Sequence, residues 1–102
     1  MHQINSGAEG PYSVALGYMT TAGNSTCMAS FAEGYGTFSN SGATHAEGYQ
    51  TTAEGEYSHA EGYRTYALGS NSHAEGHSTS AIANRSHAEG YQTTASGETS
   101  HA

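Results

Sequence analysis

The sequence predicts an all-β solenoid made of 14-residue coils, and three observations lead to that prediction. The stretch Ser-His-Ala-Glu-Gly, complete or with one change, begins at positions 30, 44, 58, 72 and 86, and a shortened copy begins at 100. Within each period, small and polar residues alternate as they do in a strand, and no helical period fits. Glycine and asparagine recur at two points of the period, where turns are expected. A fixed period through most of a chain is typical of stacked repeats.

Composition is compatible with this fold and argues against several kinds of partner. Val, Ile, Leu and Phe together number seven in 102 residues, and the formal charge is −7, a combination that usually predicts disorder. A stacked coil buries the same small residue at every level, however, and so needs no large apolar core. Two basic residues against nine acidic ones argue against nucleic acid and anionic membranes. No apolar run is long enough to span a bilayer.

Residues 1–12 are expected to form an irregular N-terminal cap or a partial coil. The stretch at residues 6–10 imitates the repeat, but it begins seven residues before the next copy. Pro11 has no amide hydrogen to donate, so it is expected to close off any ladder there.

Residues 13–102 are expected to form the repeat array. The copy that starts at Ser13 is apolar, with Val14 in the histidine position and Leu16 in the glutamate position. Seventeen residues separate Ser13 from Ser30, so three extra residues near 24–28 are expected to bulge at one turn and leave the stack intact. The last copy stops after three residues, which suggests an excised fragment in which a missing signal segment says nothing about location.

One coil is expected to contain two short strands. His59 and Glu61 alternate with Ala60, so the two polar side chains share one face and the alanine takes the other. Thr65 and Ala67 alternate in the same way in the second half of the coil. The alanines expected to point into their own coils are Ala46, Ala60, Ala74 and Ala88.

Two turns close the coil. Gly62 is expected near one bend, and Gly69 with Asn71 at the other, because both residue types tolerate the positive φ of tight turns. Adjacent coils would then lie roughly 4.8 Å apart.

The apolar copy Ser13-Val14-Ala15-Leu16-Gly17, with the small residues and Gly–Asn turns behind it, resembles the head repeat of trimeric autotransporter adhesins, the YadA-like head. The Ser-His-Ala-Glu-Gly form is similar to a polar variant of that repeat, which is also found in bacterial surface proteins and in phage tail or appendage proteins. The resemblance covers about residues 13–102. It implies a left-handed parallel β-roll, a homotrimer around an axis, and attachment to host extracellular matrix or a cell-surface receptor. His and Glu stand where the family usually has two aliphatic residues.

The repeated polar residues form two predicted ladders, which we place on the trimer axis. A 14-residue coil is too thin to form a full core alone, and three coils side by side would solve this. The face that carries Val14 and Leu16 is expected to turn inward, and His-to-Glu contacts are expected between neighbouring chains. The ladder residues that share this face by register are His45, Glu47, His59, Glu61, His73, Glu75, His87 and Glu89.

A structural hydrogen-bond network is the favoured interpretation of these ladders. The alternative is a metal site in which three copies of one histidine meet around the threefold axis. Catalysis by a His–Glu pair is not favoured, because every coil has the same pair and no nucleophile stands apart. We therefore assign no catalytic residue, no cofactor and no metal ligand.

Two further ladders follow from the period. The aromatic ladder could stack a glycan, but a column of rings that stabilises coil stacking is favoured; its members are Tyr35, Tyr49, Tyr63, His77 and Tyr91. A threonine also recurs in each coil, yet the position after it varies, so ice binding remains only an alternative.

These observations predict a non-enzymatic trimeric head or spacer domain of a bacterial surface adhesin, which mediates or displays attachment to host or other surfaces. It would lie outside the cell, without nucleic acid and without membrane contact by this segment. The alternative is a structural β-solenoid segment of a phage tail fibre or appendage protein, located on the virion.

Overall fold

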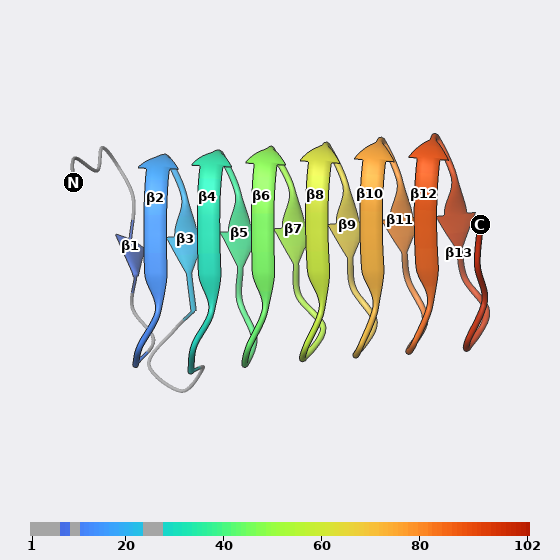
Figure 1. Ribbon diagram of the computed structural model, residues 1–102, viewed down its shortest axis with the longest axis horizontal. Helices are drawn as coiled ribbons and strands as arrows, with labels where there is room; N and C mark the ends of the chain where they lie inside the picture. The colour runs from blue at the N-terminus through green and yellow to red at the C-terminus, as the bar shows by residue number, and fades with distance from the viewer. Residues whose placement is uncertain (1–6, 9–10, 24–27) are drawn as a thin grey trace.

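The computed structural model confirms an all-β chain in which parallel strands stack into a solenoid (Figure 1). The structure describes residues 7–8, 11–23 and 28–102. A six-stranded sheet of five-residue strands faces a seven-stranded sheet of two-residue strands, and all paired strands are parallel. The described part of the chain contains no helix, and therefore none that could cross a membrane.

Each full coil contributes one long strand and one short strand, and the sheets are ordered as the chain runs. The long strands are β2 (Val14–Tyr18), β4 (Phe31–Tyr35), β6 (His45–Tyr49), β8 (His59–Tyr63), β10 (His73–His77) and β12 (His87–Tyr91). The short strands are β1 (Gly7–Ala8), β3 (Thr21–Ala22), β5 (Phe38–Ser39), β7 (Thr52–Ala53), β9 (Tyr66–Ala67), β11 (Ser80–Ala81) and β13 (Thr94–Ala95). The molecule measures 36 × 24 × 13 Å.

The register pairs each residue with its equivalent one coil away. His59 pairs with His73 and Glu61 with Glu75 along β8 and β10. The longer step after Ser13 leaves this register intact, because Val14 pairs with Phe31. The extra residues predicted near 24–28 lie almost wholly outside the described residues.

The stretch at residues 6–10 that imitates the repeat is described only at Gly7 and Ala8. Gly7 and Ala8 form the short strand β1, which pairs with Thr21 and Ala22 of β3. This segment therefore occupies the second half of a coil, which is why it precedes the next copy by seven residues.

The interior consists of small side chains. Ala46, Ala60, Ala74 and Ala88 are all fully buried, as predicted. They belong to a column that faces a second alanine column on the short strands. Threonine and serine fill the ends of the coil, with Thr65 at 0 % and Ser58 at 2 % exposure. The fold therefore buries small side chains at each level in place of large apolar ones.

Buried hydroxyl groups bond to main-chain carbonyl groups of their own coil. Thr51 Oγ1 donates to the carbonyl oxygen of Glu47 at 3.1 Å, and Ser86 Oγ donates to that of Ala83 at 2.6 Å. Where serine replaces alanine at position 39, its hydroxyl lies 2.7 Å from that of Thr44. The polar interior is thus partly satisfied within the coil.

Gly62 lies near a bend as predicted, two residues before Arg64, and the second turn lies at Gly69–Asn71 as expected. Gly62 lies inside β8 with φ 112°, and the left-handed residue of the following bend is Arg64, with φ 54°. A Cβ added to Gly62 would collide with the carbonyl oxygen of Gly76 in the next coil. Close approach of neighbouring backbones therefore requires glycine in the strand, and the bend itself accepts a larger residue.

Replacing Gly62 with alanine should lower the free energy of unfolding by roughly 2–6 kcal/mol, since backbone strain and overpacking each contribute about 1–3 kcal/mol. Denaturant unfolding followed by circular dichroism measures this loss. Gly42→Ala is the matched control, because its φ is not positive and the nearest atom to an added Cβ is Glu56 Oε2 at 3.9 Å. Equal losses for both variants would contradict the proposed role of Gly62.

Candidate functional site

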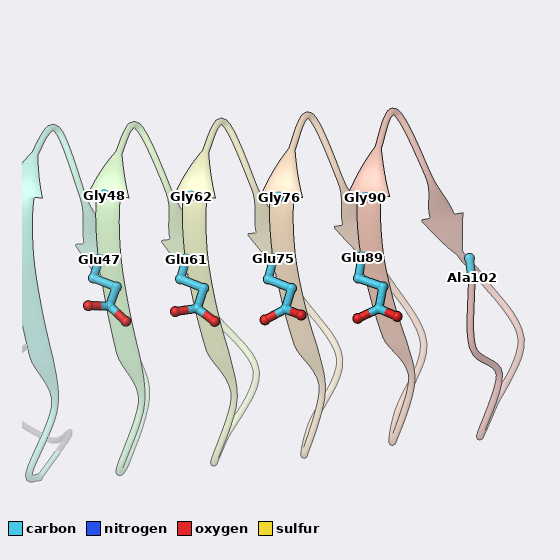
Figure 2. A pocket seen from close by; sticks show the side chains of 9 residues that line it. All are labelled: Glu47, Gly48, Glu61, Gly62, Glu75, Gly76, Glu89, Gly90 and Ala102. Atoms are coloured by element: carbon cyan, nitrogen blue, oxygen red, sulfur yellow. The ribbon is translucent and has the colours of Figure 1, made fainter.

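The long-strand sheet carries three parallel columns of side chains on its outer face. Each long strand from β6 to β12 places histidine first, glutamate third and an aromatic ring or histidine fifth. Figure 2 shows Glu47, Glu61, Glu75 and Glu89 projecting in the same direction from successive strands. The in-register pairing of the strands aligns them in this way.

The histidine column is a stack of imidazole rings. Ring centroids of His59 and His73 lie 4.9 Å apart with an interplanar angle of 1°. The same arrangement continues from His73 to His87 at 4.8 Å and from His87 to His101 at 4.6 Å. Phe31 stands at the head of this stack, 4.9 Å from His45 and tilted by 57°.

Each imidazole points its Nε2 atom at a carboxylate. His59 Nε2 lies 3.4 Å from Glu47 Oε2 of the preceding coil. His73 Nε2 lies 3.5 Å from Glu61 Oε2 and 3.5 Å from Glu75 Oε1. The imidazole nitrogens and carboxylates therefore alternate along the sheet.

The side chains of this ladder are partly exposed. His73 and Glu75 retain 36 % and 37 % of their side-chain exposure. A partly exposed column of like charges repels itself, and the imidazole nitrogens are the polar atoms that lie beside the carboxylates on this face.

An open groove of about 1000 Å³ runs along the glutamate column. It crosses four successive coils, and glycine provides the strand position beside each carboxylate (Figure 2). The residues that line it are Glu47, Gly48, Glu61, Gly62, Glu75, Gly76, Glu89, Gly90 and Ala102. The groove is therefore lined by the same two residue types in each of the four coils, and no one of these coils differs from the others.

The aromatic column is a continuous ring stack. Tyr35 and Tyr49 lie 4.8 Å apart, Tyr49 and Tyr63 5.1 Å, and Tyr63 and His77 4.7 Å, with interplanar angles of 4–7°. Tyr91 continues the column, 4.9 Å from His77. The rings cover one another's faces and leave mainly edges to solvent. A sugar could stack on an inner ring only if two rings separated, which favours the structural interpretation.

The sequence-predicted residues occupy the expected columns. Val14 pairs with Phe31 and thereby continues the histidine column, while Leu16 pairs with Glu33 and continues the glutamate column. Their position at a trimer axis stays a prediction. Sequence reasoning missed the imidazole stacking and the glycine groove, although a glycine at one fixed point of every period is the signal for the groove.

The chemistry available on this face is that of imidazole and carboxylate. The described residues contain three groups of side chains, and within each group the donor atoms lie within 4.8 Å of one another. They are His45–Glu47–His59, Glu61–His73–Glu75 and His87–Glu89–His101.

Comparison with known families gives one finding. The family model described as the YadA head domain repeat matches the chain in two copies, over residues 4–25 and 60–82. The second copy includes β10, one of the long strands that carry the His and Glu columns. No curated protein matches the chain.

Replacing Tyr63 with alanine should lower the free energy of unfolding by roughly 1–3 kcal/mol, because two ring pairs are lost at about 0.5–1.5 kcal/mol each. Thermal or denaturant unfolding measures this change. Tyr57→Ala is the matched control, since Tyr57 is 61 % exposed and lies outside the ring column. If Tyr63→Ala cost no more than the control, the column would not stabilise the stack.

Proposed function

We propose that this chain, an array of YadA-like head repeats, is the trimeric head or spacer domain of a bacterial surface adhesin. The observation that carries the proposal is the match to the YadA head repeat, found on a chain that folds as a parallel β-solenoid. YadA-like heads generally form trimers, and YadA-type adhesins are exposed at the cell surface. The family resemblance implies that the solenoid is left-handed.

The thinness of the coil supports a trimer. One chain is only 13 Å across its shortest dimension, and its buried side chains are Ala, Thr and Ser. Such a coil buries little apolar surface on its own. Three chains packed side by side would bury one more face of each coil.

We place the long-strand face toward the axis. This face carries Val14 and Leu16 on the first described long strand. The half-exposed His and Glu columns continue from them on the following long strands. The glycine groove beside the carboxylates leaves room for side chains of a neighbouring chain. Carboxylates that lose water in such an interface require hydrogen-bond or charge partners, and histidines of the same or the adjacent chain would supply them.

The short-strand face would then point outward and carry the attachment sites. Its outer position varies from coil to coil, with Phe38 and Tyr66 among smaller residues such as Thr52 and Ser80. Weak contacts repeated on three chains of a stiff rod would give strong attachment through multivalency. No coil holds a unique catalytic pair, so the proposed role is non-enzymatic.

The test has two parts. Light scattering should give three times the chain mass of 10.5 kDa. Beads coated with the protein should then adhere to extracellular matrix or cultured cells, and Phe38→Ser with Tyr66→Ser should reduce bead retention. Serine already occupies this column at Ser80, so these variants are expected to fold.

Thr52→Ser with Thr94→Ser, in the same column, is the control and should adhere like the unaltered protein. A single-chain mass at every concentration would contradict the trimer. A trimer that adheres to no surface would contradict the adhesin role and favour a spacer role.

A further inference from the structure

The geometry points to a metal-binding face: we propose that the His–Glu ladder binds divalent transition-metal ions of the Zn²⁺ class, up to three per chain. Each ion would take one of the three donor groups described above. The groups share no residue, so all three can be filled together. Every donor comes from one chain, and the proposal therefore does not depend on the trimer.

The distances between imidazole nitrogens and carboxylate oxygens are long for hydrogen bonds and match the separation of two metal ligands, although the His59–Glu47 contact also forms a long hydrogen bond. His59 Nε2 lies 3.4 Å from Glu47 Oε2, and His73 Nε2 lies 3.5 Å from an oxygen of each neighbouring glutamate. Hydrogen bonds from nitrogen to oxygen usually span about 2.7–3.2 Å. Two ligands held about 2.1 Å from a tetrahedral Zn²⁺ are about 3.4 Å apart.

A second observation comes from the ring nitrogens themselves. The Nε2 atoms of His45, His73 and His87 are inaccessible to solvent and form no hydrogen bond, although a glutamate oxygen lies 3.5–4.0 Å from each. One of these nitrogens belongs to each of the three groups. A buried polar atom without a partner is costly, and a bound metal ion would remove that cost.

The charge of the face also favours cations. The chain has only two basic residues, and both contact other parts of the surface. Arg64 bonds to Gln50 and lies over Tyr63, while Arg85 pairs with Glu98. No arginine or lysine therefore offsets the glutamate column, and divalent ions between successive carboxylates would reduce its self-repulsion.

The donor set selects the class of ion. Mixed imidazole and carboxylate ligands suit Zn²⁺ and its neighbours in the first transition series, whereas Ca²⁺ and Mg²⁺ prefer oxygen ligands alone. Three protein ligands leave at least one coordination position open, which water or a group on another molecule would fill.

Calorimetric titration of the metal-free protein with Zn²⁺ tests the proposal. The unaltered chain should bind close to three ions, and His73→Phe should bind one fewer. Phenylalanine already stands in this column at Phe31, so the ring stack is expected to survive the change. Glu75→Gln provides a second variant of the same group and should also lose one ion.

His77→Tyr is the matched control, because it removes an imidazole from the aromatic column, where tyrosine is the usual residue. It should bind as many ions as the unaltered chain. Ca²⁺ at the same concentration should neither bind to the face nor displace Zn²⁺.

Thermal unfolding gives an independent readout. Zn²⁺ should raise the melting temperature of the unaltered chain and of His77→Tyr more than that of His73→Phe. The proposal fails if Zn²⁺ does not bind. It fails equally if His73→Phe and Glu75→Gln keep full stoichiometry, or if His77→Tyr loses as much as they do.

Discussion

The parallel hydrogen-bond ladder between successive coils is the interaction on which the rest of the structure depends. The amide of His59 donates to the carbonyl oxygen of Ser72 at 3.0 Å in the following coil, and the amide of Arg64 donates to that of Tyr49 at 2.8 Å in the preceding one. Because this pattern repeats, each residue of the stack lies beside the equivalent residue of the next coil. Ring columns with spacings of 4.6–5.1 Å are its direct consequence.

The same ladder brings the coils so close together that several positions of the repeat require particular residues. Backbones that approach this closely leave no room for a side chain at Gly62 or Gly69. Tight bends hold Arg64 and Asn71 in left-handed conformations at φ 54° and 59°. Left-handed geometry disfavours most L-residues by about 1–2 kcal/mol, so the hydrogen bonds on either side of each bend must hold these conformations in place. Electrostatic repulsion between the stacked carboxylates also destabilises the stack, and the neighbouring imidazoles lie close enough to reduce it.

Much of this architecture could be predicted from the period alone. Alternation placed Ala60 inside and His59 with Glu61 outside, and a constant step implied columns of identical residues. The reason for glycine at position 62 could not be derived in this way, because it lies in the close approach of the next coil's backbone and not in a local turn. The three donor groups depend on side-chain rotamers, which no repeat pattern specifies.

Trans-hydrogen-bond nitrogen–carbonyl couplings measured by NMR test the ladder most directly. The predicted result is a series of couplings from each histidine amide to the carbonyl carbon 13 residues later, such as His45 to Ser58 and His59 to Ser72. A second series should connect bend amides to carbonyls 15 residues earlier, such as Gln50 to Tyr35. Couplings of these histidine amides, or of the bend amides from Gln50 onward, at other separations, or none between coils, would contradict the in-register stack.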